Sequence, residues 1–202
     1  RGTLAYEARR SGALLIHYST DYVFDGENRT PYREDDTPNP VSEYGRSKLE
    51  GEQAIERSGC RHVILRTCWV YAARGNNFVR TILRLARERG ELSVVGDQTG
   101  SPTAAHEIAA ATAALLAQGA PADGIYHLSA AGETTWHEFA LAILSLTGQG
   151  QTKVRRITTA EYPTAAQRPR YSVLSNEKIR NASGVALAEW RAPLETVGRA
   201  LR

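Results

Sequence analysis

The chain has 202 residues, of which 42% are hydrophobic and 23% are charged, and its formal net charge is +3 at pH 7. These are ordinary values for a globular protein of one domain, or of one and a half. No apolar run of about 18 residues is present, and no basic cluster is interleaved with aromatic residues, so we expect neither a membrane nor a nucleic-acid partner. The modest basic excess suits an anionic small molecule.

The cysteine and histidine residues give no sign of a disulfide framework or a metal centre. Cys60 and Cys68 have no metal-type spacing, and we expect two reduced thiols in a cytoplasmic protein. The five histidines form no short ligand pair, so no metal site is predicted, although bound Mg²⁺ is not resolvable from the sequence.

The first half of the chain alternates between predicted strands and helices. Residues 1–12 are typical of the last turns of a helix. Residues 12–19 (GALLIHYS) are hydrophobic on both faces, which indicates a strand buried on both sides, as in a parallel sheet. A helical pattern follows over residues 42–57. Residues 61–71 (RHVILRTCWVY) predict a second strand buried on both sides.

The alternation continues in the second half. A helix is expected over residues 76–89, with Asn76 or Asn77 as its cap. Thr135 and Glu138 form a capping-box signature at the start of another helix. The other expected elements are strands at 92–97, 124–129 and 153–158, a turn-rich loop after residue 97, and helices at 104–119, 135–146 and 189–201.

This order of elements predicts an α/β fold with a mainly parallel sheet. A strand buried on both faces needs neighbours, yet only one helix precedes residues 12–19. We therefore expect further sheet strands upstream of the chain or from another chain.

The segment 18–48 carries the residues best suited to chemistry. Tyr44 and Lys48 are four residues apart, so on a helix both lie on one face, and a lysine ammonium near a tyrosine favours its phenolate. The pair can act as an acid/base unit, although this spacing is common by chance in exposed residues. Thr20 ends the first strand, where ligands of open α/β sheets bind. The long polar loop between them is expected to be free to border a pocket.

Several ordered motifs resemble the extended short-chain dehydrogenase/reductase superfamily and, within it, the dTDP-4-dehydrorhamnose reductase family. The resemblance covers essentially the whole chain. The motifs are STDYVFDG (19–26), PYRED (31–35), P-x-P-x-x-x-YGRSKLEGE (38–52), RTCWVYA (66–72), GDQTGSPT (96–103) and RPRYSVLSNEKI (168–179).

The resemblance implies a Rossmann-type, doubly wound parallel sheet with a smaller C-terminal α/β substrate domain. Residues 1–95 would belong to the first and residues 96–202 mainly to the second, with some segments returning to the sheet. The implied reaction moves a hydride from NADPH (or NADH) to carbon 4 of a dTDP-linked 4-keto sugar in the cytoplasm, and a homodimer is possible. Tyr44 would be the catalytic acid, Lys48 its partner and cofactor anchor, and Thr20 the third catalytic residue.

The resemblance also implies substrate contacts. Trp69 would pack against the deoxysugar, Asp21 would contact the sugar nucleotide, and Arg168 would pair with the diphosphate. From the residues alone, a core tryptophan, a turn-closing carboxylate and a surface ion pair remain alternatives. Gln98, Gly100 and Thr103 are weaker candidates for the nucleotide pocket.

The chain departs from the family in one respect, because it contains no glycine-rich G-x-x-G-x-x-G turn to cradle a cofactor pyrophosphate. We therefore expect a fragment that does not oxidise NADPH by itself. Two alternative functions stay open. One is another sugar-nucleotide epimerase or dehydratase, although dehydratases typically carry an acidic pair where Asp21-Tyr22 stands here. The other is a non-catalytic module similar to the regulatory subunit of methionine adenosyltransferase.

Overall fold

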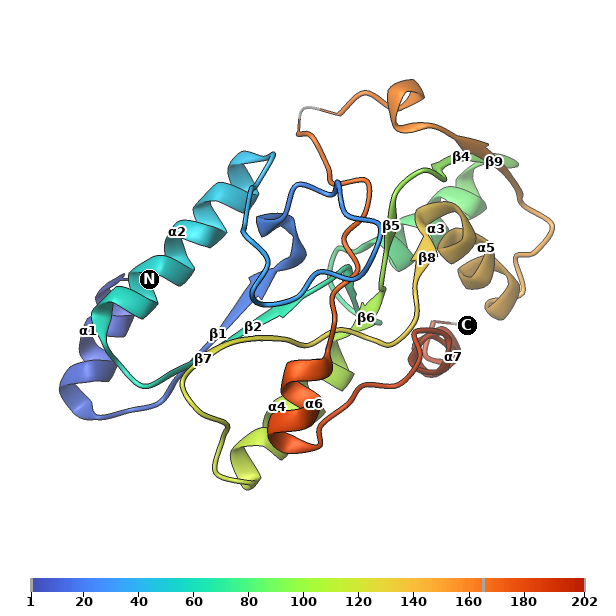
Figure 1. Ribbon diagram of the computed structural model, residues 1–202. Helices are drawn as coiled ribbons and strands as arrows, with labels where there is room; N and C mark the ends of the chain where they lie inside the picture. Colours follow the sequence, from blue (N-terminus) through green and yellow to red (C-terminus); the bar gives the residue numbers. More distant parts are fainter. Residues whose placement is uncertain (1, 165, 202) are drawn as a thin grey trace.

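A three-stranded parallel sheet in the order β1-β2-β7 forms one lobe of the protein in the computed structural model, which describes residues 2–164 and 166–201 (Figure 1). Its strands are β1 (Leu15–Thr20), β2 (His62–Thr67) and β7 (Gly124–His127). Thr20 pairs in register with Thr67, so β1 and β2 end at the same level. Every residue of β2 is buried, which confirms the prediction of a strand covered on both sides.

Helices cover both faces of this sheet (Figure 1). On one face, α1 (Gly2–Ser11) and α2 (Glu43–Ser58) pack through residues such as Ala5 and Ile55 against Ile64 of β2. On the other face, α4 (Ala105–Ala117) and α6 (Glu177–Ser183) pack against the alternate residues of β2. The predicted α/β architecture with helices on both sides of a parallel sheet is therefore confirmed.

A second lobe is built around an aromatic core. Strand β4 (Glu91–Val95) pairs in parallel with β9 (Lys153–Ile157), and a 3₁₀ turn, η2 (Thr159–Glu161), follows β9. Helices α3 (Phe78–Glu88), α5 (Trp136–Leu146) and α7 (Arg191–Arg199) share one hydrophobic cluster with β4. Thus α3 and β4 lie in this lobe, whereas α4, β7 and α6 return to the first. The proposed boundary between residues 95 and 96 stays a prediction.

Short strand pairs join the two lobes. Strand β3 (Val70–Tyr71) pairs with β6 (Thr103–Ala104), and β5 (Thr99–Gly100) pairs with β8 (Thr134–Thr135). β5 and β6 fall in the segment that was expected to be a turn-rich loop. This segment therefore contains two short strands, and their pairing with β8 and β3 connects the lobes.

The prediction of one strand over residues 61–71 is wrong in one detail. Cys68 and Trp69 interrupt it and separate β2 from β3. Trp69 has a φ of 45°, in the left-handed region, which cannot continue an extended strand. Helix α6 was not predicted. Asn77 rather than Asn76 caps α3, where its side chain accepts a hydrogen bond from Arg80 N.

The long loop between the 3₁₀ turn η1 (Asp21–Val23) and α2 is tied down rather than free. Tyr32 N donates to the carbonyl oxygen of Val173 at 2.9 Å, and Ser175 N donates to that of Tyr32 at 2.7 Å. The residues after Arg168 therefore run along the loop as an extra strand-like segment and fix its position.

A buried ion pair fastens α2 to the sheet. The Arg66 guanidinium donates to both carboxylate oxygens of Glu52, at 3.0 and 2.7 Å, and both side chains are at most 2% exposed. The guanidinium also lies over the ring of Phe24, 5.1 Å from its centroid. This two-point contact sets the orientation of α2 on the sheet.

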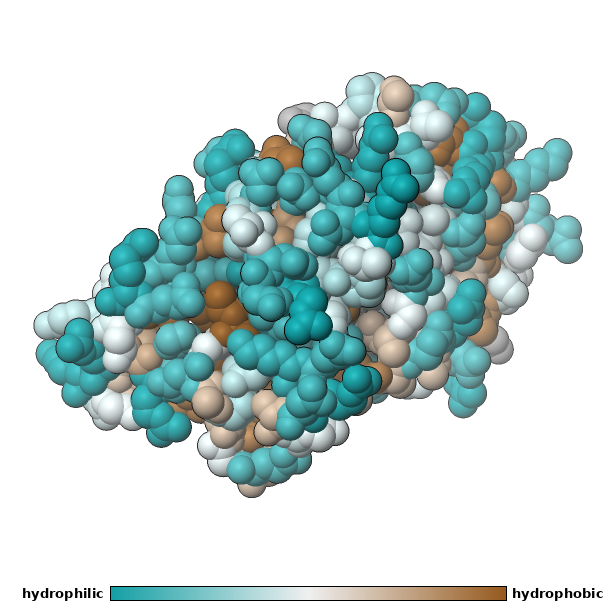
Figure 2. Space-filling model, in the orientation of Figure 1, coloured by the Kyte–Doolittle hydropathy of each residue, from teal (hydrophilic) through white to brown (hydrophobic). Residues whose placement is uncertain are grey.

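The surface seen in Figure 2 is mainly hydrophilic, with hydrophobic residues in separate spots. Among residues 2–164 and 166–201, no helix has the length and apolar character needed to span a membrane.

Candidate functional site

The start of α2 lies unusually close to the end of β1. Ser42 caps the helix by accepting a hydrogen bond from Gly45 N at 3.1 Å. A Cβ atom on Gly45 would lie 2.1 Å from the carbonyl oxygen of Tyr22, so only glycine permits this approach. The ring of Tyr44 consequently meets that of Tyr22 edge to face, with centroids 5.9 Å apart. The Tyr-Gly dipeptide thus brings α2 to the residues that follow β1.

Tyr44 and Lys48 lie on the side of α2 that faces β1. Lys48 Nζ donates a hydrogen bond to the carbonyl oxygen of Tyr18 in that strand. Tyr44 keeps 54% of its surface exposed and lines a cavity together with Thr20. Thr20, Tyr44 and Lys48, which were predicted from the sequence, therefore lie around the junction of β1 and α2. Lys48 is one helical turn beyond the cavity.

This cavity has a volume of about 220 Å³ and lies beyond the carboxyl ends of β1 and β2, and we call it the tyrosine cavity. The hydroxyl oxygens of Ser19 and Thr67 are buried beside it, and neither has a hydrogen-bond partner within the described part of the chain. Unpaired buried hydroxyl groups are costly unless a ligand satisfies them. The lining residues are Ser19, Thr20, Asp21, Tyr22, Tyr44, Thr67, Trp69, Val70 and Trp136.

An apolar cavity of about 300 Å³ lies on the other side of Thr67. Its walls come from Tyr18, Val70 and the first turns of α4, including Ile108. The Tyr18 hydroxyl group is held by a 2.8 Å hydrogen bond to Thr112. A polar cavity and an apolar one therefore share a wall at the ends of β1 and β2.

Trp69 is held between two other residues of the site. Its ring stacks on that of Trp136, with centroids 3.5 Å apart and planes at 7°. A Cβ atom on Gly100 would lie 2.4 Å from the Trp69 ring, so only glycine permits this close contact. Unusual backbone angles cluster at functional sites, and the φ of 45° at Trp69 is such a case.

Asp21 contributes to the wall of the tyrosine cavity, but its carboxylate points into the protein and is 2% exposed. Thr20 Oγ1 donates to Oδ1 at 3.0 Å, and Cys68 Sγ donates to Oδ2 at 3.2 Å. Burial raises the pKa of Asp21 to about 6, against the opposing effect of hydrogen bonds from Ser172, Cys68 and Thr20. Direct contact between this side chain and a sugar nucleotide stays a prediction.

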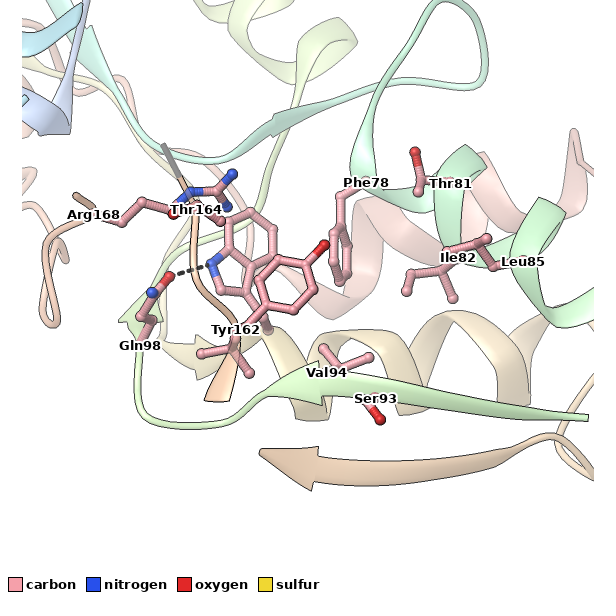
Figure 3. Close-up of a pocket in the computed structure, with 12 residues that line it drawn as sticks. Phe78, Thr81, Ile82, Leu85, Ser93, Val94, Gln98, Tyr162, Thr164 and Arg168 are labelled. Carbon is pink, nitrogen blue, oxygen red and sulfur yellow. Dashed lines mark hydrogen bonds between the residues drawn. The ribbon is translucent and has the colours of Figure 1, made fainter. Parts of the chain in front are cut away.

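A third cavity, of about 250 Å³, lies in the second lobe against α3, β4 and α5 and is shown in Figure 3; we call it the arginine cavity. Trp136 lines both this cavity and the tyrosine cavity, and its Nε1 donates to Gln98 Oε1 at 3.2 Å. Figure 3 shows Arg168 and Gln98 at the same end of the cavity. Arg168 makes no salt bridge within the described residues. The remaining walls include Phe78, Ile82, Leu85 and Tyr162.

The weaker candidates for the nucleotide pocket take different positions. Gln98 lines the arginine cavity, and Gly100 supports Trp69. Thr103 is fully buried, and its hydroxyl group donates to Ser101 O and accepts from Ala130 N. Thr103 therefore serves the packing between the lobes.

Sequence reasoning did not identify Trp136, Tyr22 or Cys68 as parts of the site. Trp136 follows the capping residue Thr135, so the local pattern marks only the start of a helix. Both cysteines are free and buried, which confirms the expected thiols. Among residues 2–164 and 166–201, no three His, Cys, Asp or Glu side chains cluster as metal ligands would.

Comparison with known proteins gives one consistent family. The family model described as "RmlD substrate binding domain" matches residues 1–202. The dTDP-4-dehydrorhamnose reductase of Burkholderia thailandensis is 48% identical over 204 residues, which cover 94% of this chain and 68% of that protein. The chain spans about two thirds of the length of such curated relatives.

Solved structures show the same similarity. A dTDP-4-dehydrorhamnose reductase from Clostridium acetobutylicum superposes with a TM-score of 0.93 at 39% identity, covering 99% of this chain and 70% of that one. One from Bacillus anthracis in complex with NADP gives a TM-score of 0.91 at 37% identity, covering 97% and 69%.

Proposed function

The chain belongs to the RmlD substrate binding domain family, and on this premise we propose that the protein containing it reduces dTDP-4-dehydro-L-rhamnose to dTDP-L-rhamnose with NADPH. The proposal rests on one observation. The tyrosine cavity is lined by Thr20, Tyr44 and Trp69, and this cavity shares Trp136 with the arginine cavity. A sugar nucleotide has a sugar, a diphosphate and a base, and two neighbouring cavities that share Trp136 suit such an elongated ligand.

The walls of the cavities suit the parts of this ligand. Trp69 offers a flat aromatic face beside Tyr44, which suits the apolar side of a deoxysugar. Arg168 lies in the arginine cavity with no acidic partner in the described residues, and a guanidinium group binds phosphate oxygens well. The aromatic rings of Phe78 and Tyr162 suit a flat base.

The residues present also fit a nicotinamide cofactor. A nicotinamide ring has an apolar face and a polar amide, and the apolar cavity beside Tyr18 adjoins the unpaired hydroxyl groups of Ser19 and Thr67. Lys48 and Tyr44 would hold the ribose at the edge of β1. When bound, the cofactor supplies the hydride that reduces carbon 4 of the sugar.

Tyr44 supplies the proton in this reaction. Its hydroxyl group donates to the oxygen at carbon 4 as negative charge develops there. Lys48, held by the Tyr18 carbonyl group one turn along α2, stabilises the phenolate that Tyr44 becomes. Thr20 contacts the sugar from the end of β1. A homodimer and a cytoplasmic location remain proposals drawn from the resemblance.

The Tyr44→Phe variant of the full-length protein tests this assignment. Loss of the phenolic proton should lower kcat by roughly 10²–10⁴-fold while leaving affinity for the dTDP-sugar nearly intact. NADPH consumption and product identity are measured, with Tyr6→Phe on α1, 62% exposed, as the control. A Phe variant that turns over at the parent rate would refute the role of Tyr44.

A further inference from the structure

Behind Thr20 lies a set of buried polar groups with no part in the proton transfer described above. We call Asp21, Cys68, Ser101 and Ser172 the Asp21 network. Each is at most 2% exposed, and they come from four separate segments of the chain. Cys68 Sγ donates to Asp21 Oδ2 at 3.2 Å, and Ser101 N donates to the same sulfur at 3.3 Å. The network joins the ends of β1 and β2 beneath the tyrosine cavity.

The network determines the direction of the Thr20 hydroxyl group. Thr20 Oγ1 donates its hydrogen to Asp21 Oδ1 at 3.0 Å and accepts a hydrogen bond from Tyr22 N at 3.1 Å. A hydroxyl group has one donor and two acceptor positions. The donor and one acceptor position are therefore used inside the protein, and one lone pair is left for a ligand.

We propose that ionised Asp21 acts as a positioning residue that holds the Thr20 hydrogen inward, so that Thr20 meets the sugar as a hydrogen-bond acceptor. The group it accepts from is a sugar hydroxyl next to the ketone, which leaves Tyr44 as the proton donor to the ketone oxygen. This inference rests on the proposed reduction of a 4-keto sugar. It adds a specificity rule, because a substrate without that hydroxyl leaves the Thr20 oxygen unpaired.

Asp21 can change its protonation state near physiological pH, and no cation among the described residues forms a salt bridge with it. Burial raises its pKa to about 6. The titratable groups that face it are Cys68, whose own pKa burial raises, and Tyr22, whose pKa is raised by burial and then by Asp21. Arg168, in the arginine cavity, lowers the pKa of Tyr22, and Tyr44, on α2, raises it.

Protonation of Asp21 should release the Thr20 hydroxyl group. A protonated carboxyl group is itself a donor and no longer requires the Thr20 hydrogen. The KM for the sugar nucleotide should then rise as the pH falls through about 6 and level off after about a tenfold increase, whereas the KM for NADPH shows no such step. In the Asp21→Asn variant of the full-length protein, the step should be absent.

Two substitutions of Cys68 give opposite expectations. A thiol is a weak hydrogen-bond donor, so Cys68→Ser supplies a stronger one, stabilises the carboxylate and moves the step to lower pH. Cys68→Ala removes the donor and moves the step to higher pH. Cys60→Ala is the matched control, because Cys60 is equally buried but lies in the apolar contact between α1, α2 and the sheet.

Carbon-13 NMR of the Asp21 carboxyl group follows the same titration without turnover. Its midpoint should move with the kinetic step in both Cys68 variants, which keeps the test intact if Asp21→Asn does not fold. Absence of sugar-dependent NADPH consumption at every pH would refute the proposed function alone. Turnover with a parent-like step in Asp21→Asn, or with Cys68→Ser and Cys68→Ala shifting together or not at all, would overturn the role of Asp21.

Discussion

Two buried carboxylates in this chain are held in different ways. Glu52 lies between α2 and the sheet and receives both arms of the Arg66 guanidinium group. Asp21 lies beneath the tyrosine cavity, and its hydrogen bonds within the described part of the chain come from neutral groups, the side chains of Ser172, Cys68 and Thr20. One negative charge is matched by a positive one, whereas the other is only partly stabilised.

The difference separates a structural role from a functional one. A cation and a carboxylate in two-point contact form a fixed link that suits the anchoring of a helix. A carboxylate stabilised by neutral donors has its pKa near 6 and can respond to pH or to a ligand. Perturbed titratable groups beside cavities are a known mark of functional sites.

The largest expected effect comes from breaking the matched pair. Glu52→Gln leaves the Arg66 charge buried without its partner and should lower the free energy of unfolding by about 3–5 kcal/mol. Urea denaturation of the full-length protein at pH 7 measures this, with Glu43→Gln as the control, because Glu43 pairs with Arg46 at the surface. Unchanged stability of Glu52→Gln would mean that the buried pair does not anchor α2.

At Asp21 we expect a smaller effect on the free energy of unfolding, and this effect depends on pH. Because its pKa in the folded protein lies above the ordinary value of 3.8, its contribution to stability is present below about pH 4 and is lost as the pH rises through about 6. Between pH 4 and pH 7 the parent should lose about 2 kcal/mol relative to Asp21→Asn. Denaturation of both proteins across this range gives the difference, and a difference that does not change with pH would remove the contrast with Glu52.

The third prediction concerns His127, whose pKa is affected by the Arg66 charge of the buried ion pair. Burial, and then the charge of Arg66, lowers the pKa of His127 to about 3. Its contribution to stability is therefore complete above pH 6.5 and is lost as the pH falls, by about 2 kcal/mol at pH 5. His127→Gln should remove this acid sensitivity in pH-dependent denaturation. If the variant keeps the parent's acid sensitivity, His127 is not its source.

Much of the fold follows from local patterns, but the exceptions come from contacts between distant segments. The apolar residues of β2 predict a strand buried on both sides. The end of β2 at Thr67 depends on how Trp69 packs against Gly100 and Trp136, which no local sequence pattern contains. Helix α6 has a single buried residue, Ile179, so its periodicity is too weak to identify.

The functional site shows the same contrast between local sequence patterns and contacts of distant segments. Tyr44, Lys48 and Thr20 were predicted because a motif and a strand end place them, and the structure brings them to one junction. The inward direction of Asp21 was not predicted, because it depends on the thiol of Cys68, which is 47 residues away in the sequence. Residues placed by their spacing in the sequence were therefore predicted, whereas a hydrogen bond between segments far apart in the sequence became visible only in the folded structure.

The stacked indoles of Trp69 and Trp136 have an optical consequence. Two aromatic chromophores with centroids 3.5 Å apart couple their electronic transitions, which gives a paired signal in ultraviolet circular dichroism. The third tryptophan, Trp190, is buried in the core and packs edge to face on Phe139 instead. Because the stacked pair borders both cavities, a ligand that enters either one alters this signal, and the protein carries its own unlabelled reporter of occupancy.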